Sequence, residues 1–274
     1  MLNLLPLREI IARHGLKPDK SLGQHFLLDP ELLSAIARAA APLAGMQVIE
    51  IGPGPGGLTR ALLAGGAAHV TAIELDARAV GALETLVASA QGRLTLLQAD
   101  ALKIDLAALV GPPRAIVANL PYNVGTALLV KWLQNAGAFQ ALTLMFQLEV
   151  AQRICAPPAT AAYGRLSVLA QWLCETEILI HIPAGAFSPP PKVDSALVRL
   201  VPRANQPGKA QIKAMERLTA AAFGQRRKML RGALRGVGGE ALLHAAGIDT
   251  ARRAETLSVQ EFEKLLQALA ARPD

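Results

Sequence analysis

The sequence predicts an α/β protein with a mostly parallel sheet, followed by a small helical domain. Three observations support this prediction. Short β-type runs alternate with helical stretches up to about residue 202, a glycine-rich loop follows the first well-defined run, and no β-type run follows residue 202. Such alternation indicates βαβ units, whose parallel sheet is covered by helices on both faces. The composition, 52% hydrophobic and 18% charged, is typical of a folded globule.

The predicted elements of the first part follow in chain order. Asp29 and Pro30, ahead of ELLSAIARAA, indicate an N-cap and a proline in the first turn of an amphipathic helix. Two later runs, 175–183 and 194–202, flank the segment SPPPK (188–192) and are expected to pair like a hairpin at the edge of the sheet. Strands are expected for five apolar runs: QVIEI (47–51), HVTAIEL (69–75), RLTLLQ (93–98), RAIVAN (114–119) and ALTLMFQ (141–147).

The pattern changes after Pro202. The segment ANQPGK (204–209) is typical of a linker, and everything beyond it has helical character. We therefore expect a large α/β domain over residues 1–202 and a small helical, basic domain over residues 203–274. The expected helices lie near 209–223, 225–235, 239–246 and 258–271.

The positive charge is unevenly distributed. Residues 1–184 carry 13 basic and 13 acidic side chains, whereas residues 185–274 carry 15 and 8, so the whole net charge of +7 lies in the last third. Such asymmetry favours a polyanionic partner such as nucleic acid over a merely solvated basic face.

Other features of the sequence limit the classes of protein to which this chain can belong. No stretch has the roughly 18 consecutive apolar residues that a membrane span needs, and the N-terminus lacks the pattern of a secretory signal, so we expect a cytoplasmic protein. Cys155 and Cys174 are too few for a disulfide framework or a metal cage, and we expect no metal. No heptad seam is present, which favours a monomer.

The loop IGPGPGG (51–57) follows the first strand of the sheet. Gly52, Gly54 and Gly56 allow a sharp turn and the close approach of a ligand. The same letters satisfy G-x-G-x-x-G, so a dinucleotide remains an alternative. However, the two prolines in the loop lack N–H groups, which reduces the donors available to a pyrophosphate.

Carboxylates stand at the ends of the next two predicted strands. Glu74 can accept hydrogen bonds from both hydroxyls of a ribose, and Asp100 can accept one from the amino group of an adenine. Together with the glycine loop, this ordered set looks like the S-adenosylmethionine site of class I methyltransferases. The alternative interpretation is an acidic surface residue at each strand end.

The fourth strand ends in Asn119-Leu120-Pro121-Tyr122. The side-chain carbonyl of Asn119 and the backbone carbonyl of Leu120 can accept the two hydrogens of an exocyclic amine, while Pro121 rigidifies the turn. Tyr122 offers a flat surface on which a base can stack. The motif resembles the N-P-P-Y type motif of amino-methyltransferases that act on adenine or cytosine.

Several stretches together resemble the small-subunit ribosomal RNA adenine N6,N6-dimethyltransferases over nearly the whole chain. The resemblance implies that the protein uses S-adenosylmethionine, releases S-adenosylhomocysteine, and dimethylates N6 of two adjacent adenosines in a hairpin near the 3′ end of small-subunit rRNA within a pre-ribosomal small subunit. The matching stretches are KSLGQHFLLD (20–29), VIEIGPGPGGLT (48–59), IELD (73–76), NLPYN (119–123), YGRLSVLAQ (163–171), FSPPPKVDSALVRL (187–200) and FGQRRKMLR (223–231).

The resemblance also implies roles for individual residues. Phe187 would sandwich the flipped adenine against Tyr122, and His25 stands where other members carry asparagine. The catalytic set would be Asn119, Leu120, Pro121, Tyr122 and Phe187. The cofactor would be bound by Gln24, His25, Leu27, Gly52, Gly54, Gly56, Glu74, Leu75, Asp100, Ala101 and Asn119. The RNA would be contacted by Arg226, Arg227, Lys228, Arg231 and Arg235.

Three alternatives remain open. A relative that methylates large-subunit rRNA would share the cofactor site and the N-L-P-Y motif. A second alternative is an RNA-binding assembly protein that has kept the fold without catalysis. The third is a nicotinamide-dependent oxidoreductase, which NAD should stabilise and S-adenosylhomocysteine should not.

Overall fold

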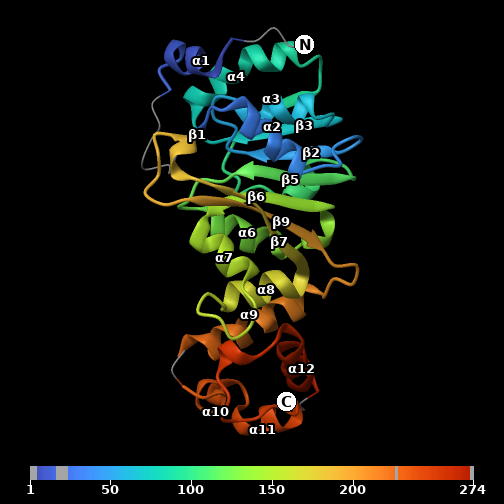
Figure 1. Cartoon of the computed structure of the whole chain (residues 1–274). Helices are drawn as coiled ribbons and strands as arrows, with labels where there is room; N and C mark the ends of the chain where they lie inside the picture. Colours follow the sequence, from blue (N-terminus) through green and yellow to red (C-terminus); the bar gives the residue numbers. More distant parts are fainter. Residues whose placement is uncertain (1–4, 17–23, 226–227, 272–274) are drawn as a thin grey trace. The chain divides into compact units, whose positions relative to one another are not determined.

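A computed structural model describes residues 5–16, 24–225 and 228–271 (Figure 1). The chain divides into two compact units, Met1–Ala151 with Glu177–Pro202 and Gln152–Thr176 with Arg203–Asp274. The segment Gln152–Thr176 lies before the expected boundary at residue 202, yet it packs with the helices that follow this residue. Within the described residues, no helix combines the length and apolarity needed to cross a bilayer.

The first unit is built around a seven-stranded sheet with the strand order β4-β3-β2-β5-β6-β9-β7. β2 pairs in parallel with β3 and β5, and β9 pairs antiparallel with β6. Strands of this unit are β1 (Phe26–Leu27), β2 (Gln47–Ile51), β3 (His69–Glu74), β4 (Leu94–Gln98), β5 (Arg114–Asn119), β6 (Ala141–Gln147), β7 (Cys174–Ile182), β8 (Phe187–Ser188) and β9 (Ser195–Pro202). Its helices are α1 (Leu7–Arg13), α2 (Pro30–Ala39), α3 (Gly57–Ala64), α4 (Ala77–Ser89), α5 (Leu106–Leu109), α6 (Gly125–Leu133) and the start of α7 (Leu148–Cys155).

The predicted fold is confirmed, including the strand pair at the edge of the sheet. β9 and β7 are neighbours there, and β9 is the strand that pairs with β6. The N-cap prediction is confirmed as well, because the Asp29 side chain accepts from the Glu31 N–H and Pro30 begins α2. The short sheet that β1 forms with β8 was not predicted, since strands of two residues leave no periodic pattern.

The central strands are mostly apolar because helices cover both faces of the sheet. Val48, Ile49 and Ile116 are almost entirely inaccessible to solvent. The chain runs from β2 to β3 on one side, whereas β5 lies on the other side of β2. A topological switch point therefore lies at the carboxyl ends of β2 and β5, which is where doubly wound sheets bind ligands.

The second unit is helical, as expected, and has its own core. The rings of Tyr163 and Phe223 lie 6.0 Å apart in an edge-on contact, and Phe223 stacks on Phe262 at 5.7 Å. Ser258 and Glu261 form a capping box at the start of the last helix. The helices that belong to this unit are the remainder of α7, α8 (Arg165–Leu173), α9 (Lys209–Gly224), α10 (Leu230–Ala233), α11 (Gly239–Ala245) and α12 (Val259–Ala270).

Candidate active site

The glycine loop after β2 forms one wall of a pocket at the carboxyl edge of the sheet. Gly52, Gly54 and Gly56 have φ values of 67°, 54° and 85°, in the left-handed region that favours glycine. A Cβ atom at Gly56 would lie 2.6 Å from Cδ2 of Leu83. The backbone conformation and the packing of α3 against α4 therefore both require glycine at this position.

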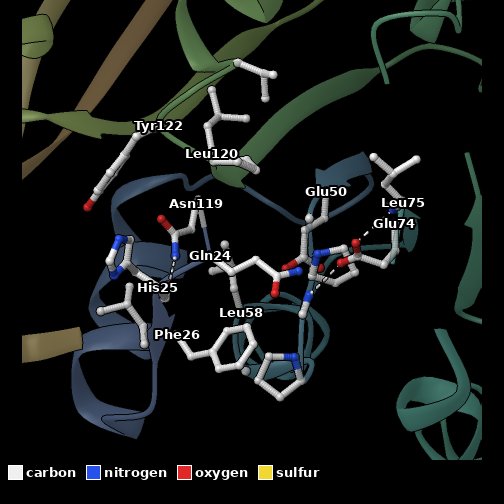
Figure 2. Close-up of a pocket in the computed structure, with 18 of the residues that line it drawn as sticks. Gln24, His25, Phe26, Glu50, Leu58, Glu74, Leu75, Asn119, Leu120 and Tyr122 are labelled. Atoms are coloured by element: carbon white, nitrogen blue, oxygen red, sulfur yellow. Dashed lines mark hydrogen bonds between the residues drawn. The ribbon is translucent and has the colours of Figure 1, made fainter. Parts of the chain in front are cut away.

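Glu74, at the end of β3, fastens the glycine loop. Its carboxylate accepts hydrogen bonds from the backbone N–H groups of Gly54 (3.1 Å), Leu75 (2.8 Å) and Asp76 (2.9 Å), as Figure 2 shows in part. Burial raises the pKa of Glu74, and these three hydrogen bonds oppose that shift. Beside it, Leu75 exposes 55% of its surface, which is unusual for a leucine and leaves an apolar face at the pocket.

Glu50 is a site residue that the sequence analysis missed. It lies in β2, lines the same pocket, is only 1% exposed and accepts a hydrogen bond from the Thr59 hydroxyl at 2.6 Å. Burial is the main cause that raises its pKa to about 8. A single acidic residue inside the apolar run QVIEI was the available signal, because a buried titratable group in a cleft marks a candidate functional site.

Replacing Glu50 by glutamine is expected to flatten the pH dependence of stability. The ordinary pKa of 4.5 applies to the unfolded chain, whereas the folded chain holds the proton up to about pH 8. The free energy of unfolding of the wild type should therefore fall as pH rises between these values, and Glu50→Gln should be more stable at pH 8 by ~2–4 kcal/mol. Urea denaturation without cofactor at pH 4.5, 6 and 8 measures this, and parallel curves for the two proteins would contradict it.

Asn119 ends β5 and lines the same pocket, on the side opposite Glu74 (Figure 2). Its amide nitrogen donates to the backbone oxygen of His25 at 3.3 Å. The carbonyl end of the side chain therefore lies toward Tyr122 in Figure 2, where it can accept a hydrogen bond from a ligand. Leu120 is buried and Pro121 lies against the glycine loop, with Cδ 3.8 Å from the position of a Cβ at Gly52.

Tyr122 is held by a contact with β9. Its hydroxyl lies 2.6 Å from Oγ of Ser195, which is fully buried at the start of that strand. Burial raises the pKa of the Tyr122 hydroxyl, so this group is neutral at physiological pH. The ring is therefore fixed at both ends, by the turn at Pro121 and by the hydrogen bond to Ser195.

Ser195→Ala is expected to lower kcat/KM for methyl transfer about 5- to 20-fold, because the ring of Tyr122 loses its anchor and about 1–2 kcal/mol of positioning. Steady-state kinetics on the RNA substrate measures the effect. Tyr122→Phe removes the same hydrogen bond, so the double variant should be no worse than either single one. Additive losses would mean that Ser195 acts in another way. Ser89→Ala, on the partly exposed end of α4, is the matched control.

The pocket gathers most of the residues expected to form the site. Those that line it are Gln24, His25, Leu27, Gly52, Gly54, Glu74, Leu75, Asn119, Leu120, Pro121 and Tyr122. Gly56, Asp100, Ala101 and Phe187 are not among the lining residues. Asp100 accepts from the Leu102 N–H at 2.9 Å, and Phe187 is buried in β8. The roles assigned to these residues stay predictions.

The basic residues expected to contact RNA belong to the second unit. Arg226 and Arg227 lie outside the described residues. Lys228, Arg231 and Arg235 are exposed, around and just after the short helix α10. In the part of the chain that the structure describes, no group of three or more His, Cys, Asp or Glu side chains is arranged to hold a metal ion.

Comparison with known proteins identifies the family. A family model described as ribosomal RNA adenine dimethylase matches residues 15–271, which span both compact units. The chain belongs to this family. The resemblance found in the sequence is thereby confirmed.

Two relatives resemble this protein over nearly its whole chain. A ribosomal RNA small subunit methyltransferase A from Gluconobacter oxydans is 55% identical over 97% of this chain and 88% of its own length. The protein of the same name from Paramagnetospirillum magneticum is 55% identical over 99% of this chain and 97% of its own. The extent of both matches shows that the similarity includes the helical C-terminal part as well as the sheet.

Solved structures of the dimethylase fold agree with this assignment. A dimethyladenosine transferase from Plasmodium falciparum has a TM-score of 0.72 at 25% identity, covering 89% of this chain and 96% of its own. The 23S rRNA methyltransferase ErmE has a TM-score of 0.67 at 29% identity, covering 89% and 99%. The expected class I methyltransferase fold, Rossmann-like with a helical addition, is therefore confirmed.

Proposed function

We propose that the protein transfers methyl groups from S-adenosylmethionine to N6 of two adjacent adenosines, two to each base, in a hairpin near the 3′ end of small-subunit rRNA. The observation that carries this proposal is the placement of Asn119-Leu120-Pro121-Tyr122 at the carboxyl end of β5, across one pocket from the glycine loop and Glu74. The family membership and the names of the similar proteins support it.

The residues of the pocket fit S-adenosylmethionine. Gly52 and Gly54 leave room for a ligand between Pro53 and Pro55 in the pocket wall, and Glu74 offers a buried carboxylate that can accept hydrogen bonds from a ribose. The bound cofactor supplies a methyl group on a positively charged sulfur, which needs no further activation. Gln24, His25 and Leu27 line the pocket from the N-terminal side, so that water can be excluded when the RNA is bound.

Asn119 and Leu120 would act on the target amine. The adenine N6 lone pair is delocalised into the ring, and the nitrogen becomes a better nucleophile as it turns pyramidal. The Asn119 side-chain carbonyl and the Leu120 backbone carbonyl would accept its two hydrogens and favour that change in the transition state. Tyr122 would stack on the base, and the reaction then depends mainly on in-line positioning.

The decisive experiment is methyl transfer from labelled S-adenosylmethionine to small ribosomal subunits that lack the modification, with the labelled nucleoside identified by mass. We expect N6,N6-dimethyladenosine at a pair of adjacent positions. Label in large-subunit rRNA alone would instead favour an activity like that of the 23S rRNA methyltransferase ErmE. No transfer, despite a rise in Tm with S-adenosylhomocysteine and tight subunit binding, would indicate an assembly factor without catalytic activity.

The exposed basic residues of the second unit would contact RNA phosphates. Replacing Lys228, Arg231 and Arg235 together by glutamine is expected to weaken rRNA binding and to reduce the slope of log affinity against log salt by about 2 to 3. Binding measured from 50 to 300 mM salt tests this. Exchanging lysine and arginine at these three positions keeps the charge and should leave the slope unchanged. An unchanged slope in the glutamine variant would show that other residues contact the phosphates.

The expected partner is a pre-ribosomal small subunit, on which the protein would act as a monomer. With rRNA of an assembling subunit as its substrate, the protein would act in the cytoplasm. Sedimentation of the protein with assembly intermediates, and its own sedimentation coefficient, would test the partner and the oligomeric state.

A further inference from the structure

His25 contacts Asn119 and Tyr122, which the proposed function assigns to the target base, and Phe187, for which the family resemblance implies the same role. Its ring stacks on Tyr122 with the ring centroids 5.4 Å apart and the planes 28° apart, and it meets Phe187 edge-on at 6.4 Å. Its backbone oxygen accepts from the amide of Asn119. Figure 2 shows the imidazole beside Asn119 and next to the ring of Tyr122. We call the space bounded by Asn119, Tyr122 and Phe187 the target-base slot.

The imidazole and an adenine cannot share this slot in the observed arrangement. An aromatic ring needs ~3.5 Å to each neighbouring plane, so a base inserted between His25 and Tyr122 needs roughly 7 Å between those rings. The observed centroid separation is 5.4 Å. Phe187, which the His25 ring meets edge-on, is a buried member of the core, so the imidazole lies between Tyr122 and the core.

Within the part of the chain that the structure describes, one side-chain hydrogen bond tethers the imidazole in the slot. Nδ1 of His25 lies 2.8 Å from the backbone oxygen of Pro189, and because a carbonyl oxygen can only accept, Nδ1 carries the proton. His25 is itself partly exposed to solvent. The His25 ring is thus held by weak, reversible contacts. Because His25 is partly exposed, the ring can move out of the slot into solvent.

We propose that His25 is a placeholder for the target adenine: its ring occupies the target-base slot in the RNA-free enzyme and is displaced when the base enters. The role would be a specificity-determining one, because only a base that stacks and donates better than the imidazole gains by displacing it. This inference rests on the proposed function, since it takes the methylated base to be the occupant of the slot.

Two variants separate the contacts of the ring. His25→Ala removes the stack and the tether, whereas His25→Asn keeps an amide that can donate to the Pro189 oxygen but has no ring. In both, the base no longer displaces a ring, so KM for the RNA is expected to fall about fivefold. His25→Trp, with a larger ring to displace, should raise KM. His14→Ala, after the end of α1, is the control for the loss of a histidine.

Steady-state methylation of unmodified small subunits by all five proteins, with S-adenosylhomocysteine binding measured alongside, decides the matter. A lower KM in both His25→Ala and His25→Asn supports the placeholder. A higher KM would show that His25 is a permanent wall of the slot, and an unchanged KM would show that its ring does not compete with the base; either overturns the inference. Should alanine disturb cofactor binding, the asparagine variant alone decides. Inactive wild-type and His14→Ala proteins would instead contradict the proposed function itself.

Discussion

Asn119→Ala is expected to reduce kcat for methyl transfer by about 10²- to 10³-fold while cofactor binding changes by less than about fivefold. The side-chain carbonyl is the acceptor that favours the pyramidal amine in the transition state, and losing one preorganised polar contact of this kind has an effect of that size. Truncation also frees the backbone oxygen of His25 from its hydrogen bond at 3.3 Å, which loosens that side of the pocket. Single-turnover methylation of small subunits measures the chemical step directly.

Two further variants give the comparison its controls. Asn119→Asp keeps an acceptor but cannot donate to His25, so it should retain more activity than alanine. Asn135→Ala changes an exposed asparagine that contributes backbone hydrogen bonds at the end of α6, and it should behave as the wild type. A loss of less than tenfold in Asn119→Ala would mean that the amine needs no acceptor from this side chain, and the proposed mechanism would have to be abandoned.

Glu74→Ala is expected to weaken S-adenosylhomocysteine binding by at least about 10²-fold and to lower the free energy of unfolding by about 2–4 kcal/mol. The carboxylate accepts from three backbone N–H groups and holds the glycine loop to the end of β3. Removing it leaves the buried N–H of Gly54 without its acceptor, at about 1–3 kcal/mol, and the two partly buried N–H groups without theirs at a smaller cost, because water can reach them. The ligand loses both the ribose acceptor and the shaped loop.

Isothermal titration and urea denaturation measure the two effects separately. Glu74→Gln keeps one acceptor oxygen and should lie between alanine and the wild type. Glu84→Ala, an exposed glutamate on α4, should change neither quantity. Normal cofactor affinity in Glu74→Ala, together with the loss of stability, would restrict Glu74 to a structural role.

Much of the fold and part of the site followed from local patterns. The runs 47–51, 114–119 and 141–147 coincide with β2, β5 and β6, because a strand buried on both faces is mostly apolar along its length. Glu74 and Asn119 were found because functional groups at the carboxyl ends of parallel strands meet at one edge of the sheet. Glu50 was missed because it lies inside a strand rather than at its carboxyl end, where functional groups are expected.

Contacts between distant segments were beyond the reach of such patterns. Tyr122 and Ser195 are 73 residues apart, and they meet because β9 inserts between β6 and β7. His25 and Pro189 are 164 residues apart, and they meet through the pairing of β1 with β8. Strands of two residues have no period, so their pairing could not be read from the sequence.

The sequence by itself indicated the main strands of the sheet, the glycine loop and the N-L-P-Y motif, because each depends on residues that are near one another in the chain, and several such motifs together indicated the family. Only the tertiary structure decided which side chains share the pocket: the burial that raises the pKa of Glu50, the anchor of Tyr122 on Ser195, and the imidazole of His25 in the target-base slot. The physical reason is that backbone preference and hydrophobic period act locally, whereas burial and ring contacts arise from the strand order that the whole chain must satisfy.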